Sequence, residues 1–411
     1  MNGAAPVKAP VVESAPLPLR LPFSLRILAD DLTGALDSAA AFGAGVPVYL
    51  DQPPLDLLAD SPAYSRSATH ESSAVSVVAT ATRDADRATL PGALAACAPW
   101  LRDAGLAFKK VDSLLRGNTL EEVRWLAVQG GFTRVIMAPA FPAQGRYMLR
   151  DHLAVIPASE PPDAQHIQGE NVRTALQNTA WPAGCELVLP QVASDADLDG
   201  LCAHYLQADG RTLWCGSAGL AAALARRWGC TQSVEDNASS AISAGSTLHT
   251  DCKLWVIGAS HQPVTQRQWA RAMAAYPQAL TVRNGNPLQL DAAAKALSGG
   301  ANGLALVNLS PSTPLGTAEA AVLLQSQVAQ LTQSTAVPAR LLVIGGDTVR
   351  ALAMATGVQH MVSGTPARPG WGRAQWRGGR WSGVWMDCRS GAFGDDGDLL
   401  AAMAAVAAVA T

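Results

Sequence analysis

The chain has 411 residues, of which 49% are hydrophobic and 15% charged, and its formal net charge is −3. This length exceeds the size at which one hydrophobic core usually stops growing, so we expect two domains with a cleft between them. The small net charge and the scarcity of lysine exclude the basic surface that nucleic acid or an anionic membrane requires, so the expected partners are small molecules.

Seven cysteines are scattered along the chain without a CxxC pair. An odd, scattered set is typical of reduced, buried thiols and not of a disulfide framework or a zinc site, which favours a cytoplasmic protein.

Residues 1–22 are rich in Ala and Pro but lack the apolar core of a signal peptide, so we expect a disordered tail there. No run is long enough to span a bilayer. The Ala-rich C-terminus is predicted to be a packed helix.

From residue 25 onward, short apolar runs alternate with helical stretches. Strands that alternate with helices predict a parallel sheet with helices on its faces. The predicted strands of the first half are 25–29, 46–50, 75–80, 108–111, 134–139 and 186–190.

After residue 229 the composition changes to a polar Ser/Thr/Asn stretch without apolar periodicity. We predict a linker over 230–250, which separates a domain of 23–229 from a domain of 251–411. The same alternation then resumes, so both domains are predicted to be α/β with mainly parallel sheets. The second half has predicted strands at 253–258, 279–283, 303–309, 340–344 and 384–388, and predicted helices at 265–276 and 318–331.

Open parallel sheets bind ligands beyond the carboxyl ends of their strands, so polar residues at these ends are candidates for a site. The first strand runs into Asp30 and Asp31, and Thr33 and Gly34 follow at a helix start. Two adjacent carboxylates can accept hydrogen bonds from a polyol or take a proton from a hydroxyl. One aspartate is enough for an N-cap, so the pair favours a ligand site. Arg83 follows another strand, but a single exposed arginine commonly has no function.

Basic residues gather after two further strands. Lys110, Asp112 and Arg116 surround one strand end, and lysine or arginine there suits a carboxylate or phosphate. A solvated basic loop is the alternative. Gln144 and Arg146 lie in a Pro-rich loop whose fixed shape could read a carboxylate or hydroxyls, although this signal is weak by itself.

Three turns of the second half carry glycine or serine directly after a predicted strand. Glycine lets a ligand approach the backbone closely and a helix N-terminus favours anions, which together can form a phosphate cradle. A tight turn that needs glycine explains any one of them equally well. The candidate residues are Ser260, Gly345, Gly346, Asp347, Thr348, Gly391 and Gly394. We expect Asp347 or Thr348 to cap the helix that follows.

Several fingerprints are missing from the sequence. There is no GxxxxGK followed by Ser or Thr, and no GxGxxG after a strand with a downstream acidic partner. A conventional P-loop ATPase and a nicotinamide dehydrogenase are therefore disfavoured. No HExxH motif is present, and the seven histidines are dispersed.

At these segments the sequence resembles the four-carbon acid sugar kinase family, formerly a family of unknown function. The matching segments follow in order along nearly the whole chain: ADDLTGALDSAAAFG, ATATR, KKVDSLLRGN, APAFPAQGR, CGSAGLA, GASHQPVT, GGDT and RSGAFG. The resemblance implies an N-terminal domain that binds the sugar acid and a C-terminal domain that binds ATP. Arg389 stands where a lysine is expected. One ring among Trp371, Trp376 and Trp381 is expected to pack near the adenine.

The resemblance further implies an ATP-dependent phosphotransferase with an alcohol acceptor, which uses Mg²⁺ and phosphorylates the terminal hydroxyl of threonate, erythronate or a 3-oxo-tetronate. Asp31 or Asp112 would orient or deprotonate that hydroxyl, Arg83 with Lys110 or Arg116 would hold the carboxylate, and the glycine turns would carry the phosphates. An NAD(P)-dependent sugar-acid dehydrogenase and a non-catalytic sugar-acid sensor are the alternatives. The sequence leaves open which tetronate is used and whether the chain forms a homo-oligomer.

Overall fold

The computed structural model describes residues 24–54, 74–156, 166–178, 181–206, 211–230, 254–298, 303–333, 336–366, 368 and 370–408. The predicted tail lies outside these residues, and so does the predicted linker apart from residue 230. The described chain forms an N-terminal part (24–230) and a C-terminal part (254–408).

The N-terminal part alternates strands with helices, as the apolar runs predict. Its strands are β1 (Leu25–Ala29), β2 (Pro47–Leu50), β3 (Val75–Ala79), β4 (Leu106–Lys110), β5 (Arg134–Ala138), β6 (Arg146–Leu149), β7 (His152–Val155), β8 (His166–Gln168), β9 (Glu186–Val188) and β10 (Thr212–Gly216). Its helices are α1 (Leu32–Ala41), α2 (Leu90–Leu94), α3 (Cys97–Arg102), α4 (Thr119–Gln129), α5 (Val172–Gln177), α6 (Asp195–Tyr205) and α7 (Ala218–Arg227).

The C-terminal part repeats this alternation. Its strands are β11 (Leu254–Gly258), β12 (Leu280–Val282), β13 (Leu304–Asn308), β14 (Arg340–Ile344), β15 (His360–Gly364), β16 (Gly372–Arg377) and β17 (Trp385–Arg389). Its helices are α8 (Pro263–Ala275), α9 (Pro287–Ser298), α10 (Thr317–Thr332), α11 (Gly346–Thr356) and α12 (Asp398–Ala408). None of the helices in the described part of the chain is long and apolar enough to cross a membrane.

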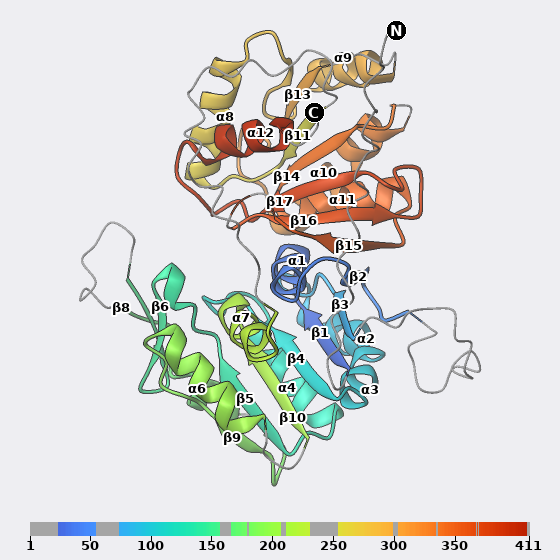
Figure 1. The fold of residues 1–411 in the computed structure, drawn as a ribbon. Coiled ribbons are helices and arrows are strands. Elements are labelled where there is room, and N and C mark those ends of the chain that lie inside the picture. The colour runs from blue at the N-terminus through green and yellow to red at the C-terminus, as the bar shows by residue number, and fades with distance from the viewer. Residues whose placement is uncertain are drawn as a thin grey trace, which may run out of the picture.

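Fourteen strands from both parts form one mainly parallel sheet, in the order β12-β13-β11-β14-β17-β16-β15-β2-β3-β1-β4-β10-β5-β9. The predicted α/β class with a mainly parallel sheet is therefore confirmed. The two parts share this sheet because β2 pairs antiparallel with β15, Tyr49 with His360 and Pro47 with Val362 (Figure 1). A separate small sheet contains β6, β7 and β8.

Helices cover the sheet, and its central strands are buried accordingly. All five residues of β3 and all five of β11 are buried, which is typical of parallel strands with helices on both faces. One apolar core runs through both parts. A second, smaller core lies under α8 and α12. Trp371, Trp376 and Trp381, one of which is expected near an adenine, are all buried in these cores. Trp376 and Trp381 pack on each other, and Trp371 faces α12.

Polar contacts hold the junction between the two parts. Ser363 of β15 is buried, and its hydroxyl donates to the Gly43 carbonyl (2.8 Å) and accepts from the Val46 backbone nitrogen (3.0 Å). Asp51 after β2 forms an ion pair with Arg350 of α11. Helix α1 lies at this junction, where it packs against α7, α11 and β16 (Figure 1). The carboxyl ends of β1 and β14 consequently lie close to each other at this junction.

Candidate functional site

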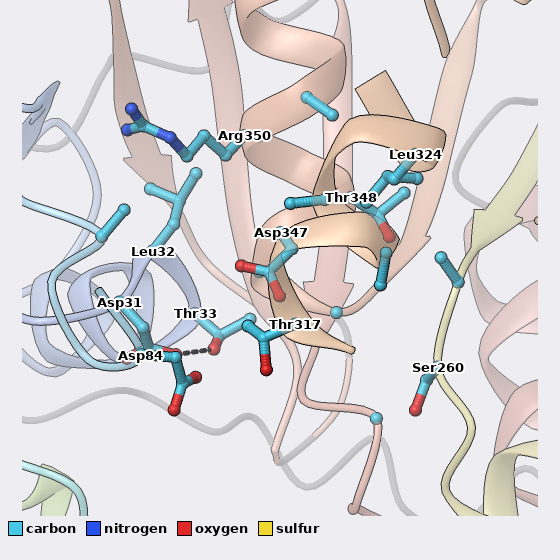
Figure 2. Close-up of a pocket in the computed structure, with 18 of the residues that line it drawn as sticks. Asp31, Leu32, Thr33, Asp84, Ser260, Thr317, Leu324, Asp347, Thr348 and Arg350 are labelled. Atoms are coloured by element: carbon cyan, nitrogen blue, oxygen red, sulfur yellow. Dashed lines mark hydrogen bonds between the residues drawn. The ribbon is translucent and has the colours of Figure 1, made fainter. Parts of the chain in front are cut away.

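A pocket of about 520 Å³ lies between the two parts. The N-terminal part lines it with the turns after β1 and β3, and the C-terminal part lines it with the turns after β11, β14 and β17 and with residues of α10 and α11. In Figure 2 the side chains of Asp31, Thr33 and Asp84 face Asp347 and Thr317, and Ser260 lies across the pocket from them. The pocket thus has the position that an open parallel sheet favours for ligands.

Two helix N-termini face each other in this pocket. The N-cap of α1 is Asp31, and the N-cap of α11 is Gly345, whose φ of 99° lies in the left-handed region that favours glycine. A methyl group added at Gly346 would lie only 3.5 Å from the Thr33 backbone nitrogen, which shows how close the two helix starts are. Helix N-termini carry partial positive charge, so their meeting favours an anion such as a phosphate.

The predicted cap of α11 is wrong. We expected Asp347 or Thr348 in that position, but Gly345 occupies it and supplies no side-chain hydrogen bond to the helix. Gly345 directly follows β14 and turns the backbone into α11. The helix therefore begins before Asp347 or Thr348 could cap it. Asp347 and Thr348 lie in the first turn of α11 and line the pocket with Gly345 and Gly346.

The aspartate pair after β1 divides into two different environments. Asp30 is fully buried and accepts from Nε and Nη2 of Arg83 at 3.2 and 2.9 Å. Asp31 accepts from the same Nη2 at 2.7 Å, caps α1 by accepting from the Gly34 nitrogen at 3.1 Å, and bonds to the Thr33 hydroxyl. Asp31 is therefore both the helix cap and a carboxylate of the pocket wall.

The surroundings of Asp31 keep it ionised. Burial opposes its charge, but Arg83 and Lys110, with the hydrogen bonds from Thr33 and Gly34, outweigh burial and lower the pKa of Asp31. A methyl group on Gly34 would lie 2.5 Å from an Asp31 oxygen and 2.7 Å from the Lys110 nitrogen, so the two charged groups converge above this residue. Lys110 does not line the pocket itself.

Asp112 is a different kind of carboxylate. It accepts from the Arg116 guanidinium at 2.8 and 2.7 Å and from the backbone nitrogens of Leu114 and Arg116 at 3.2 and 3.1 Å. Burial raises its pKa, but the bonds from Arg116 and the charge of Arg83 bring that pKa well below its ordinary value. Asp112 does not line the pocket, whereas Arg116 does. The geometry therefore favours Asp31 over Asp112 as the group that meets a substrate.

The two lysines at the end of β4 point in different directions. Lys109 is fully buried and forms an ion pair of 2.9 Å with the equally buried Glu122 of α4. Burial disfavours the charged lysine, but Glu122 outweighs it and raises the pKa of Lys109. Lys109 is thus a component of the core under the site, and Lys110 is the lysine beside Asp31.

Gln144 and Arg146 lie outside the pocket lining, next to the Asp112 and Arg116 pair. Arg146 Nη1 donates to the Ser113 hydroxyl at 2.7 Å and to the Gln144 side-chain oxygen. Within the described ranges, no carboxylate lies at ion-pair distance from Arg146. Burial lowers the pKa of Arg146, which is the cost of a half-buried cation with neutral partners.

The turns after β11 and β17 touch each other. A methyl group on Gly391 would clash with the Ser260 hydroxyl, so glycine is required there for the close approach of the two turns. Both residues line the pocket. Gly394 does not; it has a φ of 82° and lies against Asp398 at the start of α12.

Sequence reasoning missed several residues of the pocket, namely Asp84, Thr317, Leu324, Arg350 and Met354. The sequence could have indicated Asp84, because it directly follows the candidate Arg83 after β3. Burial first, and then the charges of Asp84 and Asp31, raise the pKa of Asp347, so these three carboxylates repel one another.

Among the residues that the structure describes, no cluster of three or more His, Cys, Asp or Glu side chains could hold a metal ion by itself.

The fold and site define an α/β protein with a pocket at the carboxyl ends of its strands, where two helix N-termini meet. Residues 25–168 match the family described as the sugar-binding N-terminal domain. A D-threonate kinase of Cupriavidus necator is 29% identical over 236 residues, which are 48% of this chain and 53% of that protein. The chain therefore matches about half the length of this relative.

Two solved structures share the fold over most of the chain. A Salmonella typhimurium LT2 protein, described as a candidate tRNA synthase, has a TM-score of 0.62 at 19% identity and covers 92% of this chain and 98% of its own. A Haemophilus influenzae protein of the family DUF1537 has a TM-score of 0.59 at 16% identity and covers 92% and 99%. These two structures show the shared fold, and the two sequence matches agree with the resemblance to the four-carbon acid sugar kinase family.

The buried ion pair gives a stability prediction. Lys109→Met leaves Glu122 as an unpaired buried charge, which is expected to lower the free energy of unfolding by about 3–5 kcal/mol in urea titrations. The double variant Lys109→Met/Glu122→Leu removes both charges and is expected to recover most of that loss. Arg87→Met, which breaks the exposed pair with Glu121, serves as the control and is expected to cost less than about 1 kcal/mol. A double variant as unstable as the single one would contradict this account.

Proposed function

We propose that this protein is an ATP-dependent kinase that phosphorylates the terminal hydroxyl of a four-carbon acid sugar. The observation that carries the proposal is the meeting of two helix N-termini, with the ionised Asp31 on one and the glycine turn of α11 on the other. Phosphoryl transfer depends mostly on positioning and on stabilising the charge of the phosphoryl group. The D-threonate kinase relative supports the same reaction class.

The C-terminal wall is suited to ATP. The start of α11, from Gly345 to Thr348, offers backbone N–H groups and the positive end of the helix to the phosphates. Leu324 of α10 and Met354 of α11 form an apolar wall on which the base can rest. Ser260 and Gly391 line the same pocket and would contact the phosphates.

The carboxylates near α11 are suited to the Mg²⁺ ion that accompanies ATP. Mg²⁺ is usually held by one or two carboxylates together with substrate phosphates and water, and not by an all-protein cage. Asp347 and Asp84 would supply such ligands, and a cation there would relieve the repulsion that raises the pKa of Asp347. The ion would neutralise charge on the transferred phosphoryl group.

The N-terminal wall is suited to the acceptor hydroxyl. Asp31 faces the pocket as an anion whose position is fixed by Arg83 and by the start of α1. Its lowered pKa makes it a weak base, so its main role is to accept a hydrogen bond from the hydroxyl and aim that oxygen at the γ-phosphate. Little proton removal is needed ahead of a loose transition state.

The arginines differ in their freedom to bind the acceptor carboxylate. Arg83 is paired with Asp30 and Asp31, and Arg116 is paired with Asp112. Arg146 has only the neutral partners Ser113 and Gln144. We therefore propose that Arg146, with Arg116 beside it, binds the carboxylate of the acceptor. The role that we propose for Arg83 is to orient Asp31.

An ADP-release assay over D-threonate, erythronate and 3-oxo-tetronates tests the function directly. Release of ADP is expected only when one of these acids is present, and EDTA is expected to abolish it because Mg²⁺ accompanies ATP. Equal ADP release without any acceptor would contradict the assignment. Binding of an acid without turnover would indicate a sensor, and an absorbance change with NAD(P) would indicate a dehydrogenase.

Asp31→Asn tests the role of the α1 cap. The amide keeps the shape of the side chain but loses the charge that aims the hydroxyl, so kcat at saturating ATP and acceptor is expected to fall by about 10²-fold. Asp103→Asn, at an exposed ion pair with Arg102, is the control and should leave kcat unchanged. A kcat for Asp31→Asn within a few-fold of the wild type would exclude this role.

Arg146→Met tests the carboxylate site. Loss of one charged hydrogen-bonding partner is expected to raise the KM for the acid sugar by about 10- to 100-fold and to leave the KM for ATP unchanged. Arg146→Lys is expected to recover part of the loss. Erythritol, which lacks the carboxylate, should be an equally poor acceptor for the wild type and for Arg146→Met. A selective effect on erythritol, or an equal rise of both KM values, would refute the assignment.

A further inference from the structure

The segment after β17 forms one wall of the pocket without regular structure of its own. Ser390, Gly391 and Ala392 line the pocket, and helix α12 begins only at Asp398. Holding each residue of an irregular segment in one conformation costs about 1–2 kcal/mol of backbone entropy. The shape of this wall must therefore come from contacts with its surroundings.

One buried side chain supplies most of these contacts. Arg389, the last residue of β17, has a fully buried side chain and does not line the pocket. Its Nη1 donates to the carbonyls of Ser390 (2.8 Å) and Phe393 (2.7 Å), its Nη2 donates to the Gln268 side-chain oxygen, and its Nε lies 3.2 Å from Asp398 Oδ2. Nη1 and Nη2 thus form hydrogen bonds, and Nε forms an ion pair without a hydrogen bond.

The partners of Arg389 belong to two helices that pack on each other. Gln268 and Thr265 come from α8, and both also bind the segment, Gln268 at the Asp395 carbonyl and Thr265 at the Gly391 carbonyl. Asp398 is the first residue of α12. The ring of Trp371 lies 5.1 Å from the Arg389 guanidinium and covers it. The segment is thus connected through Arg389 to the frame formed by α8 and α12.

We propose that Arg389 is a positioning residue that, with Gln268 and Asp398, preorganises the segment 390–394 for the nucleotide. The proposal rests on the kinase function proposed above. Without Arg389 the segment would have to be ordered at the moment of binding, which weakens the affinity for the nucleotide. The acceptor groups lie in the other part of the chain and would keep their arrangement.

The contacts of Arg389 require the planar guanidinium fork of arginine, and a positive charge alone would not form them. Arginine can bond two carbonyls, an amide oxygen and a carboxylate from three nitrogens, whereas lysine has a single nitrogen. Lysine at this position would keep the charge near Asp398 but lose most of the bonds to the segment. This difference separates a positioning role from a purely electrostatic one.

Steady-state kinetics of Arg389→Met and Arg389→Lys test the proposal. Both variants are expected to raise the KM for ATP by about tenfold or more and to change the KM for the acid sugar by less than about twofold. Arg377→Met, at an exposed arginine on β16, is the control and should behave as the wild type. A wild-type KM for ATP in Arg389→Lys, or an equal rise of both KM values, would overturn the proposal.

Amide hydrogen exchange gives a readout that does not depend on activity. In Arg389→Met the amides of 391–394 are expected to exchange about tenfold faster or more, while those of β14 and α11 keep their protection. Unchanged exchange in the segment would overturn the proposal. If the wild type transfers no phosphoryl group but this exchange effect appears, the kinase function fails and the anchoring stands. Should Arg389→Met not fold, Asp398→Asn, which removes the ion pairs of Asp398 with Arg389 and Arg368, must show the same pattern at reduced size.

Discussion

The pairing of β2 with β15 is the contact on which the arrangement of the site depends. It joins strands from the two parts into one sheet, and the buried Ser363 fixes the turn that precedes β2. Only β2 and β3 lie between β15 and β1 in the sheet, and the start of α1 lies close to the start of α11. The pocket between them therefore results from sheet continuity and needs no additional structural element.

The charges around the pocket are arranged by pairing. Arg83 is fixed between Asp30 and Asp31, Arg116 is bound by Asp112, and Arg146 is left with neutral partners. Such pairing keeps Asp31 ionised at the wall of the pocket, and it is the reason why we propose Arg146, which lies beside Arg116 outside the pocket lining, as the arginine that binds an anion. The same local principle recurs at Arg389, whose charge is used inside the protein to hold a backbone segment. Formal charge alone therefore does not identify a ligand-binding arginine in this molecule.

Much of the fold follows from local sequence patterns, because the parallel strands are apolar runs that end at polar turns. The patterns located β1, β3, β11 and β14, but not β10, β15, β16 or the small β6–β8 sheet. The strands of the small sheet and β16 have short and partly polar sequences that lack a strand signature. Most of the turns that the sequence singled out line one pocket, but the sequence did not show which side chains of each turn face it. Lys109 and Lys110 have opposite directions because neighbouring side chains of a strand alternate, and only the packing of α4 shows which one is buried. The inward direction of Arg389 depends on α8, which lies more than a hundred residues earlier in the chain.

We propose that a phosphoryl group passes from ATP on the α11 side to a hydroxyl held on the α1 side. The most direct measurement is phosphorus NMR of the wild-type protein incubated with Mg²⁺, ATP and D-threonate or another tetronate. We expect ADP together with a new phosphomonoester resonance, split into a triplet by the two protons of a terminal CH₂ group. Unchanged ATP with every tetronate, or conversion of ATP to ADP and inorganic phosphate alone, would contradict it.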